Sequence, residues 1–294
     1  MTTRREFIKN ASIIAAGAAL IPSFACSLTP AKHAVGIQLY SLRDIIGNDI
    51  IGIIQKLAAM GYKEVETYGY SAKGGFWGLD AKTFAAMLKT NGISSPSGHF
   101  NFDNMMAGKD GSEELKSYIE AANTLGSKYV TVPYLQGGVR KTADDYKKIA
   151  EKLNLAAKLC KSSGLKLAYH NHDFEFTKFG DQTGLDILLK ETDKNMVDFE
   201  LDLYWVARSK VDPIALFKAY PQRFTMWHVK DMDKQNNEVN TEVGQGTIDF
   251  KAIFAQAKLS GVKYYFVEHE RNYKPDQLGS VKTSFDYVNN VLLK

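Results

Sequence analysis

The sequence predicts an α/β fold, a single (β/α)8 barrel of the TIM type, and three observations support this. Short β-branched or aromatic runs alternate with longer amphipathic stretches, in units of about 30 residues each. Eight such units follow one another without a long linker, which favours a closed barrel over an open sheet. Histidines gather at the ends of the expected strands, the face at which such barrels carry their active sites.

Each expected element is bounded by recognisable residues. The expected strands are 35–40, 64–68, 94–99, 129–133, 166–170, 197–202, 225–229 and 264–268. The expected helices are 50–60, 81–91, 113–125, 143–163, 185–191, 213–220, 250–259 and 281–293. Expected helix-ending glycines are Gly61, Gly92, Gly126, Gly164 and Gly261, and expected N-caps are Asp80, Thr142, Asp212 and Asp249. Because parallel strands need crossover connections, this alternation predicts a parallel sheet.

Composition is that of an ordinary globular protein. The 294 residues are 45% hydrophobic, enough for the core of one barrel domain, which we expect at 33–294. The net charge is only +4 and no basic run stands out, so nothing predicts a nucleic-acid partner. The two cysteines exclude a disulfide framework, and Cys160 is expected to be a buried free thiol on a helix.

Residues 1–26 are predicted to be an export signal and not part of the barrel. The run TRREFIK at 3–9 resembles a twin-arginine signal, and the apolar stretch at 13–21 is too short for a stable membrane span. A small residue precedes Cys26, as at a lipoprotein cleavage site, so Cys26 is a candidate lipid anchor. The alternatives are a tethered signal anchor and plain cleavage near Ala25. We therefore expect an exported protein, either periplasmic or anchored to the membrane as a lipoprotein.

Histidines and acids mark one end of the expected barrel. All six His except His33 lie at or just past the end of an expected strand: His99, His170, His172, His228 and His269. Asp202 ends the sixth strand and Glu268 the eighth, each after an apolar run. A lone carboxylate there would carry a heavy desolvation cost, which a bound cation removes.

Four of these residues form the predicted metal site: His170, Asp202, His228 and Glu268. Their mixed nitrogen and oxygen donors suit Mn²⁺, Zn²⁺, Co²⁺ or Fe²⁺ better than Ca²⁺. Taken singly, His228 could be a buried core histidine and Asp202 a helix cap. Their joint placement favours one divalent ion with an open position for a substrate oxygen.

Four segments carry a family resemblance: GIQLYSLRD at 36–44, AYHNHDFEF at 168–176, WHVKD at 227–231 and GQGTIDF at 244–250. On these motifs the chain resembles the xylose isomerase-like barrel superfamily over 35–293, and within it the sugar phosphate isomerase/epimerase group that carries export signals. The resemblance implies that the residues ending strands five to eight hold the metal. In this sequence those residues are His170, Asp202, His228 and Glu268.

Two positions depart from the patterns of that superfamily. Its epimerases usually have a glutamate where this chain has His170, and they use the strand-five and strand-eight carboxylates as opposed bases. His170 therefore argues against a symmetrical two-carboxylate mechanism. The three-metal endonucleases of the superfamily carry a histidine where this chain has Trp205, which argues against a DNA-repair enzyme.

Further residues near the strand ends are expected to shape the pocket. The candidate catalytic residues are Glu268, Glu175, His172 and Lys230. The candidate sugar contacts are Gln38, Tyr40, His99, Tyr134, Asn171, Trp205 and Lys230. Alternatively, Glu175 is a solvated loop acid, Lys230 pairs with Asp231 at the surface, and His172 orients His170. The glycine turn at 244–246 lacks the P-loop pattern and is interpreted as a tight loop near the pocket mouth.

These residues predict proton abstraction next to a sugar carbonyl, and three functions remain open. The first is a metal-dependent isomerase or epimerase. The second is a 3-keto-glycoside lyase or hydratase that expels a leaving group, favoured by the expected export, since sugar phosphates are mainly cytoplasmic, and by His170. The third is a catalytically silent sugar-binding lipoprotein. The expected partner is a small sugar or keto-sugar, and oligomer formation stays open.

Overall fold

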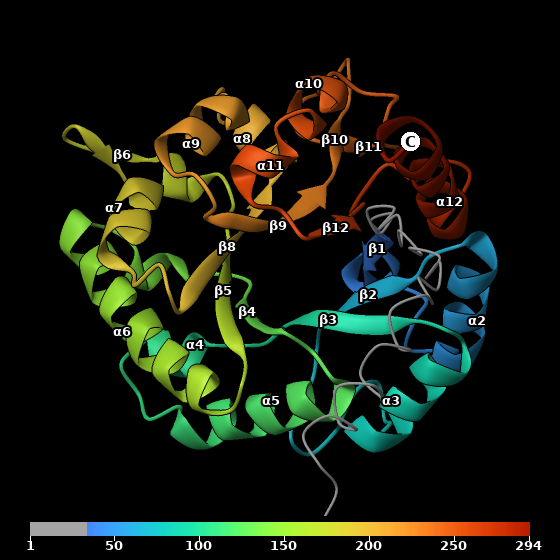
Figure 1. Ribbon diagram of the computed structural model, residues 1–294, viewed down its shortest axis with the longest axis horizontal. Helices are drawn as coiled ribbons and strands as arrows, with labels where there is room; N and C mark the ends of the chain where they lie inside the picture. The colour runs from blue at the N-terminus through green and yellow to red at the C-terminus, as the bar shows by residue number, and fades with distance from the viewer. Residues whose placement is uncertain (1–33) are drawn as a thin grey trace, which may run out of the picture. The chain divides into compact units, whose positions relative to one another are not determined.

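The predicted α/β barrel is confirmed. The computed structural model describes residues 34–294, so the predicted export signal, Cys26 and His33 lie outside the described residues. Eight parallel strands close into a barrel in the order β1-β12-β9-β8-β5-β4-β3-β2 (Figure 1). They are β1 Val35–Gln38, β2 Glu64–Thr67, β3 Ser94–His99, β4 Tyr129–Val132, β5 Lys166–His170, β8 Val197–Asp202, β9 Phe224–Val229 and β12 Tyr264–Val267. The first and last strands pair directly, with Ile37 opposite Val267.

Helices surround this barrel (Figure 1). The longer ones are α2 Ile50–Met60, α3 Ala81–Thr90, α5 Ser112–Leu125, α6 Ala143–Ser162, α7 Gly184–Glu191, α9 Pro213–Ala219 and α12 Gln277–Tyr287. The shorter ones are α4 Asp103–Met106, α8 Leu203–Arg208, α10 Phe250–Phe254, α11 Ala257–Ser260, η1 Leu39–Leu42, η2 Gly137–Val139, η3 Phe174–Phe176 and η4 Val288–Leu292. Two small hairpins pair β6 Lys178–Phe179 with β7 Gln182–Thr183, and β10 Asp231–Met232 with β11 Asn240–Thr241. Among residues 34–294, no helix has the length and apolarity to cross a membrane.

Most helix boundaries have the expected physical cause. The predicted N-caps Asp80, Thr142, Asp212 and Asp249 all accept a hydrogen bond from a backbone N–H in the first helical turn. Gly61 ends α2 with φ of 108°, a conformation that a residue with a Cβ rarely adopts.

Three elements differ from the expectation. The first strand ends at Gln38, because the Gln38 side chain accepts a hydrogen bond from the N–H of Tyr40 and starts η1. The helix expected at 250–259 is divided, since the N–H of Gln256 bonds to the carbonyl of Ile253, only three residues back. The last helix starts four residues earlier than expected, after the N-cap Asp276, and continues into η4.

The barrel interior changes from apolar to polar along its axis. A large apolar core lies between the sheet and the helices, and a second, small cluster consists of Tyr129, Ala168, Met226 and Phe266. Polar residues follow two positions later on three of these strands: His170 after Ala168, His228 after Met226 and Glu268 after Phe266. Because side chains two apart on a strand share a face, the polar groups lie directly above the apolar ones. This layer carries the candidate site.

Candidate metal centre and active site

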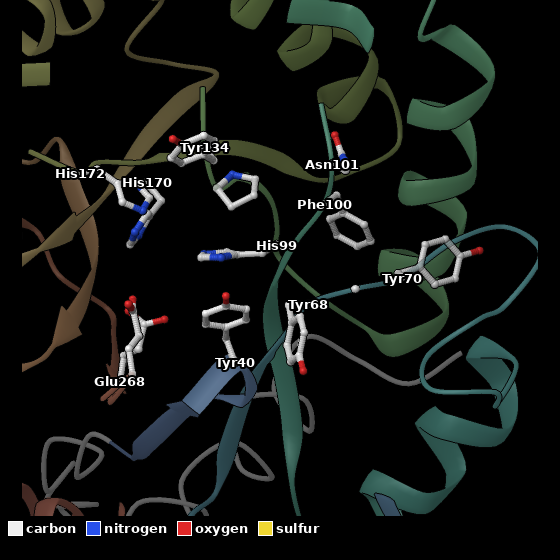
Figure 2. Close-up of a pocket in the computed structure, with 13 residues that line it drawn as sticks. Tyr40, Tyr68, Tyr70, His99, Phe100, Asn101, Tyr134, His170, His172 and Glu268 are labelled. Atoms are coloured by element: carbon white, nitrogen blue, oxygen red, sulfur yellow. The ribbon is translucent and has the colours of Figure 1, made fainter. Parts of the chain in front are cut away.

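A cavity of about 400 Å³ opens beside the strand ends. Six of the residues expected in the site line it: Tyr40, His99, Tyr134, His170, His172 and Glu268 (Figure 2). The rest of its lining is Tyr68, Gly69, Tyr70, Phe100, Asn101, Pro133 and Glu270. The Glu268 carboxylate points toward the imidazoles of His170 and His172 (Figure 2). The volume lies in the range of small-molecule sites.

Three of the four predicted metal ligands form a buried cluster. His228 Nδ1 lies 3.1 Å from Glu268 Oε2 and 4.0 Å from Asp202 Oδ2. One ligand atom from each of the three residues lies within 4.8 Å of the others. These donors are one imidazole nitrogen and two carboxylate oxygens, a set that suits a divalent transition metal.

Asp202 is the N-cap of α8, as one interpretation of its sequence position suggested, and its second carboxylate oxygen is left for the other. Its Oδ1 caps α8 by accepting hydrogen bonds from the backbone N–H groups of Tyr204 and Trp205. Its Oδ2 is buried and accepts no hydrogen bond from residues 34–294, although the Lys230 ammonium lies 3.5 Å away. A buried carboxylate oxygen left without a hydrogen bond carries a desolvation cost, which a cation between Asp202, His228 and Glu268 would remove. The residues present therefore fit the predicted metal.

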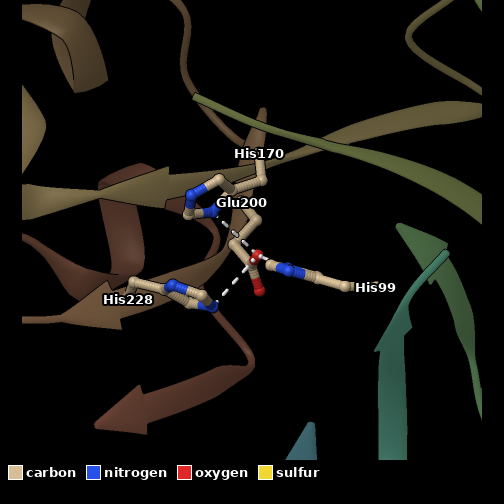
Figure 3. A group of neighbouring side chains, drawn as sticks. All are labelled: His99, His170, Glu200 and His228. Atoms are coloured by element: carbon tan, nitrogen blue, oxygen red, sulfur yellow. Dashed lines mark hydrogen bonds and ion pairs between the residues drawn. The ribbon is translucent and has the colours of Figure 1, made fainter. Parts of the chain in front are cut away.

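His170, the fourth predicted ligand, belongs to a second cluster that shares His228 (Figure 3). Its centre is Glu200, whose Oε2 lies 2.7 Å from His99 Nε2, 3.1 Å from His170 Nδ1 and 3.1 Å from His228 Nε2. The structure thus joins three of the four predicted ligands in one group. It places the ring of His170 beside them, with its centroid 4.5 Å from that of His228.

Two buried carboxylates orient the two imidazoles. His228 Nε2 lies 2.7 Å from Glu66 Oε2, which leaves Nδ1 for the cluster with Asp202 and Glu268. Glu200 holds His170 through Nδ1 in the same way. Imidazoles that bind metals commonly donate their other N–H to a carboxylate, which fixes the orientation of the ring. Gln38, an expected sugar contact, is fully buried and donates to Glu66 at 2.7 Å, so it supports this layer and does not line the cavity.

Replacing Glu66 with glutamine is expected to weaken metal binding by about 10- to 100-fold. The neutral amide oxygen accepts the His228 hydrogen bond more weakly than the negatively charged carboxylate does. Competition with a chelator measures the affinity. Glu64→Gln is the matched control, since Glu64 lies on the same strand and has no hydrogen bond to His228. Equal affinities of the Glu66 variant and the wild-type protein would contradict this role.

Burial and charge together set the protonation of this layer. Burial would raise the pKa of Glu66, but His99 and His228 hold it well below its usual range. Burial and then Glu66 would raise the pKa of Glu200, but His228 and His99 lower it to about 2. Burial opposes a charge on His99, yet Glu66 and Glu200 raise its pKa to about 9. The layer is therefore a set of buried ion pairs, whose mutual attraction offsets the loss of water.

Lys230 is fully buried between the cluster and the rim of the cavity. Its Nζ lies 3.1 Å from Glu268 Oε2, 3.5 Å from Asp202 Oδ2 and 2.5 Å from Glu270 Oε1. Burial would lower the pKa of Lys230, but Glu268 and Glu270 raise it well above its ordinary value. The alternative of a surface pair with Asp231 is wrong, because Lys230 is buried and bonds other acids.

Asp231 instead holds the glycine turn at 244–246. Its carboxylate accepts hydrogen bonds from the backbone N–H groups of Gly244 at 2.9 Å, Gly246 at 3.0 Å and Ile248 at 3.2 Å. A Cβ on Gly246 would lie 2.3 Å from Asp231 Oδ1, which explains the glycine. The anion in this turn is thus a carboxylate of the chain itself, in agreement with the interpretation as a tight loop.

His172 lines the cavity, and its buried Nδ1 has no hydrogen-bond partner among residues 34–294. Its ring stacks on Phe174 with centroids 5.4 Å apart and meets Tyr134 and His170 edge to face. Burial, followed by the Lys230 ammonium, lowers the pKa of His172 to about 3. The imidazole is therefore neutral at physiological pH.

Glu175 is an expected base that the structure places elsewhere. It is fully buried and does not line the cavity. Its Oε1 accepts a hydrogen bond from the Tyr169 hydroxyl at 2.5 Å, and its Oε2 accepts one from the backbone N–H of His172 at 2.8 Å. Glu175 thus fixes the segment that carries His172, and neither the role of base nor that of solvated loop acid fits this position.

A Glu175→Gln variant is expected to change how stability depends on pH. Burial raises the pKa of Glu175 from 4.5 to about 7. Between these values the folded state holds a proton that the unfolded chain has lost, so the free energy of unfolding falls as pH rises. The variant lacks the Glu175 contribution to this fall in the free energy of unfolding, which is on the order of 3 kcal/mol.

Urea unfolding at about pH 5 and about pH 8 measures the decline. Glu151→Gln, an exposed change on α6, is the control and keeps the wild-type slope. A Glu175 variant with the wild-type slope would contradict the raised pKa.

Three other expected sugar contacts lie outside the main cavity, and the fully buried Lys230 is one of them. Asn171 is buried, and its Oδ1 accepts a hydrogen bond from the backbone N–H of Asp202 at 3.0 Å, so it ties two strand ends together. Trp205 contacts His172, with ring centroids 5.4 Å apart, but lines a neighbouring cavity.

Sequence analysis missed Glu66 and Glu200, which hold the imidazoles. Both lie within strands, whereas the predicted site residues lie at or after strand ends. A signal was available for Glu200, because it lies two residues before Asp202 and therefore on the same face of the strand. Glu270, which binds Lys230 and lines the cavity, was also missed.

Comparison with known proteins decides the family. The model of the family described as xylose isomerase-like TIM barrel matches residues 54–290. The chain belongs to this family. It is similar to an inosose dehydratase from Clostridium perfringens (strain ATCC 13124), with 26% identity over 252 residues that cover 74% of this chain and 82% of the relative.

Solved structures share the barrel. A crystal structure of a sugar phosphate isomerase/epimerase from Parabacteroides distasonis ATCC 8503 has a TM-score of 0.77 and 26% identity, and covers 92% of this chain and 98% of that one. A structure of the IOLI protein with a bound zinc atom has a TM-score of 0.69 and 17% identity, and covers 88% of this chain and 98% of that one. The latter similarity concerns the fold alone.

Proposed function

We propose that this member of the xylose isomerase-like family is a metal-dependent enzyme that abstracts a proton next to the carbonyl of a keto-sugar and expels a leaving group from the neighbouring carbon. The observation that carries the proposal is the asymmetry of the cavity. Its two carboxylates, Glu268 and Glu270, both follow β12, and the side that they face carries neutral His172. The inosose dehydratase relatives, which are named for loss of water, support the same reaction type.

Asp202, His228 and Glu268 would hold the divalent ion, with His170 beside them. When bound, this ion supplies Lewis-acid polarisation of the substrate carbonyl. The bound zinc of the IOLI structure supports a divalent metal, and Mn²⁺, Zn²⁺, Co²⁺ and Fe²⁺ remain the proposed ions. Lys230 keeps Glu268 ionised, because burial alone would raise the pKa of Glu268, whereas Lys230 and His228 hold it well below its usual range.

His172 is the proposed acid–base group. It takes the proton from the carbon next to the carbonyl, and the electron pair of that C–H bond forms a C=C bond. The substituent on the next carbon leaves with its bonding electrons, and His172 returns the proton to the departing oxygen. The products are an unsaturated ketone and water or an alcohol. Phe174 and Tyr134 hold the ring in place, and Glu175 fixes its backbone.

A 3-keto-glycoside with a chromogenic aglycone tests the proposal in the presence of Mn²⁺ or Zn²⁺. Release of the aglycone with formation of the unsaturated ketone is the expected result. Incorporation of deuterium from D2O next to the carbonyl reports the first step separately. Metal binding without turnover of any keto-sugar or keto-glycoside would contradict the enzyme and favour the sugar-binding protein.

Isomerisation or epimerisation is the second candidate. Similarity to the Parabacteroides distasonis isomerase/epimerase structures supports it. Glu268 points toward His172 across the cavity, so two proton acceptors could address opposite faces of a substrate (Figure 2). Epimerised free sugar without aglycone release would favour this reaction over elimination.

We also propose that residues 1–26 direct export, with Cys26 as a candidate lipid anchor. The motif TRREFIK at 3–9 supports this proposal. Fractionation of cells that produce the full chain, compared with an Arg4→Lys/Arg5→Lys variant, tests it. Equal distribution of both proteins in the cytoplasm would contradict export.

A further inference from the structure

A second cavity adjoins the proposed active site. Its volume is about 270 Å³, and its lining is Tyr204, Trp205, Arg208, Glu238, Asn240, Glu270 and Arg271. Glu270 lines both cavities, so the two cavities meet at this side chain. Lys230 fixes Glu270, because its Nζ bonds Glu270 at 2.5 Å and lies 5.2 Å from the Trp205 ring centre and 5.3 Å from that of Tyr204.

The second cavity offers an aromatic surface beside polar groups. Trp205 is partly exposed, and its Nε1 is a buried donor that has no hydrogen-bond partner within residues 34–294. Arg208 stacks at 5.1 Å over the Trp205 ring and is held by Glu238 at 3.0 Å. Arg271 is exposed and makes no ion pair in the described part of the chain. An apolar ring face with nearby donors and acceptors matches a pyranose, whose faces carry C–H groups and whose edges carry hydroxyls.

Trp205 also connects this cavity with the proposed chemistry. Its ring centroid lies 5.4 Å from that of His172, the proposed acid–base group. A group expelled from the ring in the first cavity would leave near His172, because that residue returns the proton to the departing oxygen. The second cavity adjoins this position on the Trp205 side.

We propose that the second cavity is a subsite for the leaving group and that this group is a second sugar ring, so that the substrate is a keto-disaccharide or a similar two-ring keto-glycoside. The inference rests on the proposed elimination and names its substrate class. The bond that breaks joins the departing oxygen to the β-carbon, the second carbon from the carbonyl carbon. The second ring then leaves with that oxygen as a free sugar after it receives the proton from His172.

Steady-state kinetics with two substrates test the subsite. One is a 3-keto-disaccharide, and the other is the matching 3-keto methyl glycoside, which has the same reacting ring and no second ring. Arg271→Ala is expected to raise KM for the disaccharide by about tenfold. KM for the methyl glycoside should stay within about twofold of the wild-type value. Arg271 is exposed, so its variant is expected to fold.

A binding measurement separates the subsite from the proposed reaction. The unreacted parent disaccharide is titrated into the wild-type protein and the Arg271→Ala variant by calorimetry, and weaker binding to the variant is expected. If the wild-type protein turns over neither keto-substrate but shows this difference, elimination fails and the sugar subsite stands. Equal KM changes for both substrates, or equal disaccharide binding by both proteins, would overturn the subsite.

Discussion

A Glu268→Gln variant is expected to lose bound metal and at least about 100-fold of kcat/KM. Its Oε2 lies 3.1 Å from both His228 Nδ1 and Lys230 Nζ, so the carboxylate is an anion in the proposed metal cluster and a partner of a buried cation. The neutral amide of glutamine has no negative charge for the metal or for Lys230. Elemental analysis of the purified protein and initial rates on the keto-glycoside measure the two losses.

Glu270→Gln is the matched control for the metal. Glu270 follows the same strand and bonds the same Lys230, yet it lies outside the cluster of Asp202, His228 and Glu268. The control is expected to keep the metal content of the wild-type protein. Unchanged metal content and unchanged rate in the Glu268 variant would disprove the assignment of this cluster.

A His172→Ala variant is expected to lose about 10²- to 10⁴-fold in kcat while keeping its metal. The imidazole is neutral and lines the cavity, so it can contact a substrate there. Deuterium incorporation from D2O should fall in parallel with turnover, because both depend on the same proton transfer.

Added imidazole distinguishes an acid–base role from a structural one. It should restore part of the turnover of the His172 variant, since the deletion leaves space beside Phe174 and Tyr134. A variant that keeps wild-type rates would exclude His172 as the base. A variant that loses its metal would instead indicate that His172 orients His170.

The position of polar residues at strand ends predicted which face of the barrel carries the site. It did not predict the buried carboxylates that lie deeper in the barrel. Asp202 and Glu268 were found because a carboxylate after an apolar run has few purely structural explanations. Glu66 and Glu200 were not predicted as site residues, because a glutamate within a short strand resembles a solvent-facing residue in sequence. Only closure of the barrel turns those positions inward, and closure is a property of all eight strands together.

Roles that depend on side-chain packing could not be predicted from sequence position alone. The sequence suggested Lys230 because it lies two residues after His228, but its three acidic partners follow other strands. Glu175 looked like a base from its place in AYHNHDFEF, whereas its partners Tyr169 and His172 come from that same segment and hold it inward. Local sequence predicted which groups carry chemistry, and packing decided which of them face the cavity.

Pairing of β1 with β12 has a consequence for synthesis of the chain. Val35 and Gly36 lie opposite Tyr265 and Phe266. The sheet therefore cannot close until the ribosome has synthesised nearly all of the polypeptide. Until then, β1 and the strand awaiting β12 present unpaired edges, which invite intermolecular pairing. Glu268 arrives with the same late segment. A nascent or prematurely terminated chain therefore has an unpaired sheet edge that can aggregate, and it lacks one of the proposed metal ligands.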